Sequence, residues 1–156
     1  MSAERLDTLE ATFRRIATTR MRGVPVLHAA LSVQAVGFVR EPAAAAASAS
    51  AKPAPTPMLM GVLVTPWFMN VLRLPISAVA DGAAAGLLPV GATAARGYGE
   101  HRLDFVGAHE PTIGAFEQAS LFSPMFSFAD QPAAVATARE VLRLLRQPVA
   151  ASRVAA

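Results

Sequence analysis

Apolar residues recur at helical spacing near both ends of the chain. Near the N-terminus this spacing predicts a helix over residues 4–20 with Ser2 as its cap, and Arg5 lies away from the apolar stripe. Near the C-terminus, Asp130 is a typical cap and Pro132 suits a first turn, so a second helix is expected to end before Pro148. The two predicted buried faces comprise Leu6, Leu9, Phe13 and Ile16, and Val135, Ala138, Val141, Leu142 and Leu145.

Extended segments fill the chain between these helices. The run at 58–65 is apolar at almost every position, which predicts a strand covered on both faces. A further strand at 67–74 follows so closely that a sharp turn or bend is required at Thr65–Pro66. Strands are also expected at 31–41, at 98–107 and, after a turn at 108–114, at 115–122, whereas the Ala/Gly-rich stretch 76–95 reads as irregular.

The order of these elements predicts an α+β fold. About five strands follow one another without intervening helices, which favours a mainly antiparallel sheet flanked by the N-terminal and C-terminal helices. Residues 1–156 are expected to form a single domain. Residues 42–57 are rich in alanine and proline and contain no large apolar side chain, so this stretch is predicted to be a flexible loop.

Composition narrows the function classes. The chain has no cysteine, which excludes disulfides, thiolate metal sites and a cysteine nucleophile. Its net charge of +3 is spread over both termini, and the middle of the chain is mildly acidic, which disfavours nucleic-acid binding. Neither a secretory signal nor a membrane-spanning apolar run is visible, so we expect a cytoplasmic protein without membrane insertion.

No pattern of catalytic or metal-binding residues stands out. The three histidines lack the short spacing of a metal site, and the chain contains no G-x-S-x-G motif and no P-loop. His101 and Asp104 lie three residues apart on a predicted strand, so their side chains point to opposite faces and cannot pair there. We therefore expect no catalytic residues, no metal and no cofactor.

Two short proline-containing segments hold an excess of large apolar side chains. They can be ordinary core, but Trp, Met and Phe are also enriched in the centres of protein interfaces. Because each segment follows or ends a strand at a proline, the two are expected to lie side by side. The hypothesised partner-binding residues are Pro66, Trp67, Phe68, Met69 and Asn70 with Ser120, Leu121, Phe122, Ser123, Pro124, Met125 and Phe126.

The same segments resemble the signature blocks of a known family. "GVLVTPWFMNVLRLP" (61–75) and "SLFSPMFSFADQPAAVATAREVL" (120–142) look like blocks of the NiFe-hydrogenase assembly chaperone family, of the HybE, HupJ and HoxT type. The resemblance covers residues 4–147 apart from the 42–57 loop. It implies a non-enzymatic accessory protein that binds the precursor of a hydrogenase small or large subunit, or its twin-arginine signal. Some members of the family work with a rubredoxin-like protein, which is a further implied partner.

The chain departs from the family at one informative position. Members often have a cysteine where this chain has Ala119, so a thiol role is excluded here. If a twin-arginine signal binds, its cations would favour nearby carboxylates, for which Glu100, Asp104, Glu117 and Asp130 are candidates. The alternative function is a small-ligand or cofactor-binding domain, with a pocket lined by the sheet and Trp67.

Overall fold

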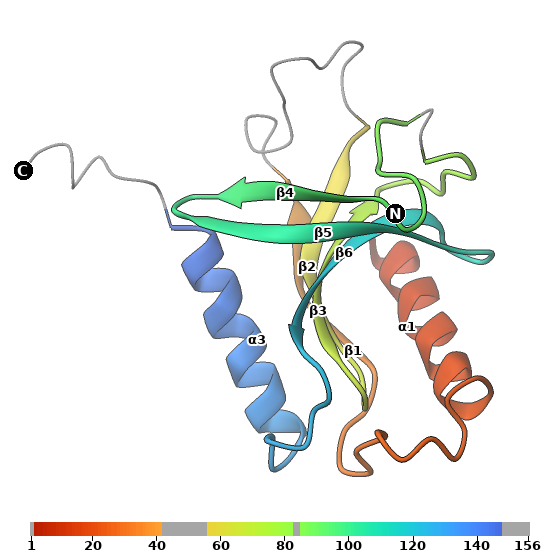
Figure 1. Cartoon of the computed structure of the whole chain (residues 1–156), viewed down its shortest axis with the longest axis vertical. Coiled ribbons are helices and arrows are strands. Elements are labelled where there is room, and N and C mark those ends of the chain that lie inside the picture. The colour runs from red at the N-terminus through yellow and green to blue at the C-terminus, as the bar shows by residue number, and fades with distance from the viewer. Residues whose placement is uncertain (1, 42–55, 83–84, 148–156) are drawn as a thin grey trace, which may run out of the picture.

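The computed structural model describes residues 2–41, 56–82 and 85–147. Its elements in chain order are α1 (Ser2–Thr18), β1 (Gln34–Arg40), β2 (Met58–Val64), β3 (Met69–Pro75), β4 (Thr93–Tyr98), β5 (His101–Glu110), β6 (Gly114–Phe122) and α3 (Gln131–Leu145). Figure 1 shows the two helices on either side of a strongly curved sheet. The predicted α+β fold with flanking terminal helices is thereby confirmed.

All paired strands of the sheet are antiparallel, in the order β1-β2-β3-β6-β5-β4. The stretch between β3 and β4 carries the chain to the far edge, and β5 and β6 then lead back to β3. Pairing between β5 and β6 begins at Glu110↔Gly114 and ends at Val106↔Gln118. Beyond that point β5 continues with β4 alone, and this two-stranded ribbon crosses over the rest of the sheet (Figure 1).

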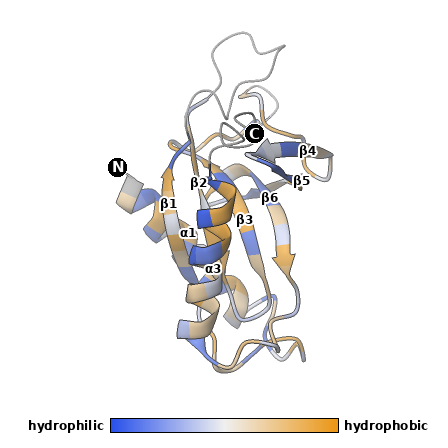
Figure 2. Ribbon diagram, turned by 90° about the vertical axis from the view of Figure 1, so that its left-hand side faces the viewer, coloured by the Kyte–Doolittle hydropathy of each residue, from blue (hydrophilic) through white to orange (hydrophobic). Residues whose placement is uncertain are grey.

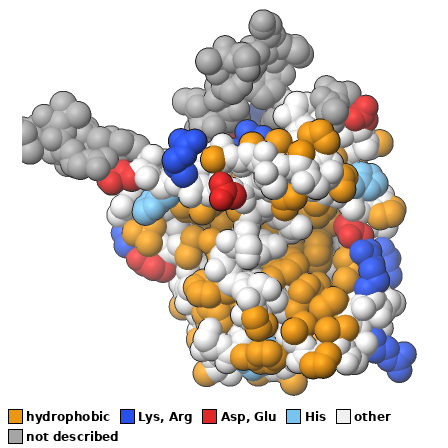
Figure 3. Space-filling model, in the orientation of Figure 1, with side chains coloured by type: hydrophobic (Ala, Val, Ile, Leu, Met, Phe, Trp, Pro, Cys, Tyr) orange, Lys and Arg blue, Asp and Glu red, His pale blue; other side chains and the backbone are white. Residues whose placement is uncertain are grey.

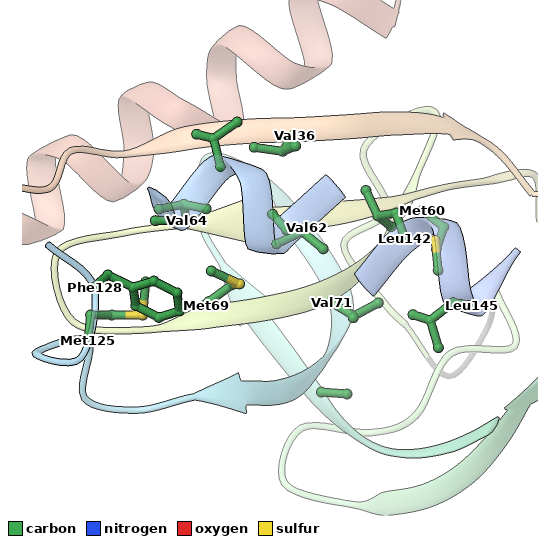
Figure 4. Close-up of a cluster of buried hydrophobic side chains, with 14 of the residues drawn as sticks. Val36, Met60, Val62, Val64, Met69, Val71, Met125, Phe128, Leu142 and Leu145 are labelled. Carbon is green, nitrogen blue, oxygen red and sulfur yellow. The ribbon is translucent and has the colours of Figure 1, made fainter. Parts of the chain in front are cut away.

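The sheet carries a hydrophobic cluster on each face. One cluster joins the buried side of α3 to β1, β2 and β3, and Figure 4 shows Met125 and Phe128 lying beside Met69 at one end of it. The other cluster joins α1 to the opposite face through Leu9, Phe13 and Ile16. In Figure 2 the central strands are mostly orange, whereas α3 also carries blue and pale patches toward solvent.

Burial of the central strands follows from this two-sided cover. Every residue of β2 and β3 is buried, which confirms the prediction of a strand covered on both faces. In β2, Leu59 and Leu63 belong to the α1 cluster, and Met60 and Val62 to the α3 cluster. Successive side chains of β2 point to opposite faces of the sheet, so this strand contributes to both hydrophobic clusters.

The sheet has six strands rather than about five. The extra strand is β4, which sequence analysis placed partly in an irregular stretch because threonine, alanine, arginine and glycine give little strand signal. Its pairing with β5, from Thr93↔Val106 to Tyr98↔His101, makes it a strand. The strand expected at 98–107 is shifted to His101–Glu110, so the following turn is shorter than the predicted 108–114.

Two further details differ from the expected pattern. The first helix begins at Ser2 rather than at residue 4. Arg5 is only 8% exposed although it lies off the apolar stripe, because its Nε donates a hydrogen bond to the Pro75 carbonyl at 2.9 Å. Residues 42–55 of the predicted flexible loop lie outside the described residues.

The cap of α3 is confirmed and gives a first testable effect. Asp130 has extended backbone geometry, and its Oδ1 accepts a hydrogen bond from the Ala133 N–H at 3.0 Å. We expect Asp130→Ala to lower the free energy of unfolding by about 1 kcal/mol. Asp130→Asn should change it little, because asparagine caps equally well. Urea unfolding of the three proteins tests this, and equal losses for both variants would contradict a capping role.

Candidate functional site

A hydroxyl group organises the turn between β2 and β3. The Thr65 Oγ1 accepts hydrogen bonds from the backbone N–H groups of Trp67 and Phe68, at 3.1 and 2.9 Å. The Thr65 N–H donates to the Phe68 carbonyl at 2.9 Å. Threonine followed by proline is well suited to such a turn, because Pro66 supplies the required φ and the hydroxyl replaces a backbone acceptor. The turn therefore holds the two aromatic residues in fixed backbone positions.

The end of β6 lies next to this turn. The β3–β6 ladder pairs Met69 with Phe122 and Asn70 with Ser120, with an irregularity between the two pairs. The Asn70 side-chain amide also donates to the Gln118 Oε1 at 2.9 Å. The two apolar segments singled out in the sequence are thus on neighbouring strands, as their positions suggested.

His28, in the loop between α1 and β1, connects these segments. Its backbone N–H donates to the Pro66 carbonyl at 2.9 Å, and its Nδ1 accepts from the Ala30 N–H at 3.1 Å. The proton must then reside on Nε2, which donates to the Phe128 carbonyl at 2.7 Å. The ring also lies 5.9 Å from that of Phe126, measured between centroids. His28 therefore links three loops at one end of the sheet: the α1–β1 loop, the β2–β3 turn and the β6–α3 loop (Figure 1).

Aromatic rings cover both sides of this end of the sheet. On the α1 side, Phe68 meets Trp67 edge-on with ring centroids 5.4 Å apart, and both rings pack on Phe13. On the α3 side, Phe122 meets Phe128 edge-on at 5.0 Å. Such edge-to-face contacts are a favourable geometry for aromatic side chains.

The hypothesised residues divide into an exposed and a buried set. Met69, Asn70 and Met125 are buried, so they support this end of the molecule from inside. Leu121 is half-buried, and Ser120 and Ser123 are exposed. Pro66, Trp67 and Phe68 are half-buried, and Phe122, Pro124 and Phe126 are exposed; we call these six residues the apolar end surface. Phe126 is 56% exposed and Phe122 36%, which is unusual for phenylalanine.

The hydrophobic atoms on this end are visible in the space-filling view. Figure 3 shows hydrophobic side chains gathered over the lower half of the face between α3 and α1, with a hollow beside α1. A contiguous exposed apolar area of this kind is a typical feature of an interaction site.

A buried cluster of charges lies away from this surface. Glu117 is fully buried and accepts hydrogen bonds from Arg73 at 2.6 Å and from Arg96 at 2.8 and 2.9 Å. Arg73 also forms two hydrogen bonds with Glu41, at 3.0 and 3.1 Å, and Glu41 accepts one from the Tyr98 hydroxyl. The cluster links the chain after β1 with β3, β4 and β6.

Ionisation in this cluster follows from its contacts. Burial alone would raise the pKa of the Glu117 carboxyl, but two guanidinium groups and the Leu88 N–H outweigh it, so this pKa lies below its ordinary value. Burial and the bond to Glu41 raise the pKa of the Tyr98 hydroxyl far above its ordinary value. The cluster is therefore a charge-balanced part of the core.

The four carboxylates predicted to attract a cationic ligand differ in burial and in the contacts they already make. Glu117 is inaccessible and already neutralised by two arginines. Asp130 caps α3 through its side chain. Glu100, in the turn between β4 and β5, and Asp104, on β5, are exposed.

Other kinds of site receive no support from the described part of the chain. It contains no group of three or more His, Asp or Glu side chains placed to hold a metal ion. The two pockets described are lined by other residues than Trp67: one lies between the start of α1 and residues 76–78, and the other between Gln34 and the start of α3. Within the same residues, neither helix is long and apolar enough to cross a membrane.

Sequence reasoning missed two residues that shape the apolar end surface. The sequence predicts a sharp turn or bend at Thr65–Pro66, but not that the Thr65 hydroxyl accepts the two backbone hydrogen bonds that hold this turn, although threonine before proline is a recognisable signal for it. For His28 the sequence shows only that the three histidines lack the short spacing of a metal site. No local pattern could have shown its role, because its partners Pro66, Phe126 and Phe128 are distant in the sequence.

Comparison with known proteins places the chain among hydrogenase accessory proteins. HoxT of Cupriavidus necator is 48% identical over 144 residues, which cover 92% of this chain and 76% of that protein. The hydrogenase expression/formation protein HupJ of Bradyrhizobium diazoefficiens is 39% identical over 142 residues, 91% of this chain and 72% of that protein. A probable rubredoxin, HupJ of Rhodobacter capsulatus, is 32% identical over 137 residues, 88% of this chain and 43% of that protein.

No solved structure matches the chain. The family model described as "NiFe-hydrogenase assembly, chaperone, HybE" matches residues 4–156, nearly the whole chain. This match agrees with the resemblance seen in the two signature blocks, which form the paired segments at the apolar end surface. The chain therefore belongs to the HybE family of NiFe-hydrogenase assembly chaperones.

Proposed function

We propose that this protein assists NiFe-hydrogenase maturation by binding the precursor of a hydrogenase subunit on its apolar end surface. The observation that carries the proposal is the exposure of Phe122 and Phe126 beside the half-buried Trp67 and Phe68. Burying such side chains against a partner yields roughly 25 cal/mol per Å² of apolar area removed from water. A surface of this kind holds a protein by contact alone, so the proposed role is non-enzymatic and needs no cofactor.

The structural support beneath the surface suits this role. Thr65 fixes the backbone of Trp67 and Phe68, and His28 ties the turn that carries them to the segment that carries Phe126. A surface whose backbone is fixed in advance loses less conformational entropy when a partner binds.

A cationic part of the precursor would find the exposed carboxylate of Asp104 on the β4–β5 ribbon. This supports the finer proposal that the bound segment includes a twin-arginine signal. A rubredoxin-like protein remains a second proposed partner, because one relative is named a probable rubredoxin. We propose that the protein binds the precursor in the cytoplasm.

The test is direct binding of purified precursors. The tagged full-length protein is titrated with the small-subunit and with the large-subunit precursor of a NiFe-hydrogenase from the same organism, by calorimetry. We expect saturable binding of one of them, and weaker or no binding of the same subunit after maturation. Absence of binding to both precursors would refute the proposal.

Trp67→Ala distinguishes an interface role from a purely structural one. Because Trp67 is half-buried, we expect a loss of about 1–3 kcal/mol in the free energy of unfolding, less than for a fully buried tryptophan. We also expect the folded variant to bind the precursor about tenfold or more weakly. Trp67→Phe should retain most of both properties. A large drop in melting temperature with unchanged affinity would assign Trp67 to the core alone.

A further inference from the structure

The second half of β6 has a free edge. Its pairing with β5 ends at Gln118, whereas its pairing with β3 continues to Phe122. Since the N–H and C=O groups of successive residues in a strand point to alternate sides, part of the backbone of residues 119–122 faces away from β3. Among the described residues, no side chain or further strand is hydrogen-bonded to these groups.

The outer edge of β1, by comparison, has backbone groups that are already hydrogen-bonded to side chains. The Ala35 N–H donates to the Glu10 carboxylate at 2.7 Å, and the Gly37 carbonyl accepts from the Arg146 guanidinium at 2.8 Å. An irregularity between Val36 and Val39 also interrupts its pairing pattern. Proteins commonly protect edge strands with charges and bulges of this kind. Residues 119–122 carry no charged side chain.

The free edge of β6 ends at the apolar end surface, which includes Phe122. Figure 3 shows a strip of white backbone and polar atoms down the middle of the face, where Figure 1 draws the lower half of β6, with hydrophobic side chains on both sides. Ser120 is exposed on this edge, and Phe122 lies at its end. The outer edge of β4 differs, since its neighbours are alanine, glycine and arginine rather than large apolar groups.

Resting on the proposed function, we propose that the hydrogenase precursor binds by adding an extended segment to β6 along residues 119–122. The added strand takes the position that β5 leaves after Val106↔Gln118. Its backbone pairs with the free groups of β6, and alternate side chains contact Phe122 on one face of the sheet and Phe68 on the other. In strand addition, backbone hydrogen bonds provide affinity and side-chain pockets provide specificity.

Charge identifies the chemistry of the added segment. Asp104 is exposed, lies two residues before the last β5–β6 pair, and has no ion-pair partner among the described residues. It therefore stands at the Gln118 end of the free edge. A cation at that end of the added strand is favoured, so the segment is apolar with an arginine or lysine at one end. A cation preceding the apolar run fits a strand parallel to β6, and a cation following it fits an antiparallel one.

Amide hydrogen exchange tests the proposal on the full-length protein with each subunit precursor. Strand addition predicts that binding slows exchange in residues 119–122, while the edge of β4 is unchanged. Binding without slower exchange in 119–122 would overturn strand addition but leave the proposed function intact. If neither precursor binds, the proposed function fails and strand addition fails with it.

Two variants make the test specific. Ser120→Lys places a charge on the free edge and should weaken precursor binding roughly tenfold or more. Thr93→Lys, a matched control on the exposed edge of β4, should leave it unchanged. A dimer of this chain that Ser120→Lys dissociates, in sedimentation without precursor, would instead assign the edge to self-association. Equal affinities of both variants and the wild type would also overturn the proposal.

The backbone contribution is measured separately with a synthetic peptide from the precursor region that the complex protects from exchange. Its amides are methylated one at a time, which removes one N–H from each peptide. Strand addition predicts that every second methylation abolishes binding and that the others are tolerated. An effect that lacks this two-residue period would contradict it.

Discussion

Glu117→Gln is expected to lower the free energy of unfolding by about 3–5 kcal/mol at neutral pH, because it breaks a fully buried ion pair. Glu117 is the shared acceptor of Arg73 and Arg96 and also accepts from the Leu88 N–H at 2.8 Å. A glutamine cannot balance two guanidinium charges, and its amide nitrogen would face a donor. The loss exceeds that of an ordinary hydrogen bond because positive charge is left buried without compensation.

The effect should depend on pH in a defined direction. The pKa of Glu117 lies below its ordinary value in the folded protein, so folding favours the ionised form of this carboxyl group. The stabilisation is complete above about pH 5, where the glutamate of the unfolded chain is ionised, and disappears as the pH falls through the lower folded-state pKa. The stability difference between the wild type and Glu117→Gln should therefore shrink as the pH is lowered below about 5, because the glutamate of the unfolded chain takes up a proton before Glu117 of the folded protein does.

Urea unfolding of both proteins between neutral and acidic pH measures this difference. Glu140→Gln is the matched control, because Glu140 pairs with Arg143 at the surface, where both side chains are more than half exposed. It should leave the urea midpoint almost unchanged. A Glu117→Gln protein as stable as the wild type at neutral pH would show that the buried cluster does not hold β4 and β6 together.

The largest effect on binding is expected from Phe122→Ser combined with Phe126→Ser. These are the most exposed aromatic residues of the apolar end surface, so their loss should weaken precursor binding by about 2 kcal/mol or more, roughly thirtyfold. Stability should fall less than for the loss of two fully buried phenylalanines, because Phe126 is 56% and Phe122 36% exposed; the lost aromatic contacts are those with His28 and Phe128.

A matched control removes exposed apolar groups elsewhere. Val90 is 73% exposed before β4 and Leu144 is 36% exposed on α3. Val90→Ser combined with Leu144→Ser should leave precursor binding unchanged. If this control weakened binding as much as the phenylalanine pair, the interaction would depend on general surface hydrophobicity rather than on the apolar end surface.

Local patterns predicted the elements whose burial is continuous and regular. The helical stripe of α1, the cap of α3 and the two-sided burial of β2 could all be predicted because each depends on residues close in sequence. The strand β4 could not, since its low strand propensity is overcome only by pairing with β5. The burial of Arg5 and Glu117 was equally hidden, because their partners are remote in the chain.

The candidate site was predictable in location but not in composition. The two proline-containing segments are neighbours, as the sequence suggested, yet Met69 and Met125 are buried while Phe126 is exposed. Composition alone cannot distinguish these cases, because the same apolar residue types serve cores and interfaces. The free edge of β6 depends on where β5 leaves the sheet, which no local pattern records.

The dissociation constant of the purified hydrogenase precursor, measured by calorimetry for the wild type and for the Phe122→Ser, Phe126→Ser protein, decides whether the apolar end surface binds the precursor. With both proteins folded, as checked by their melting temperatures, we expect tight binding for the wild type and binding about thirtyfold weaker for the variant. Equal dissociation constants for the two folded proteins would contradict it.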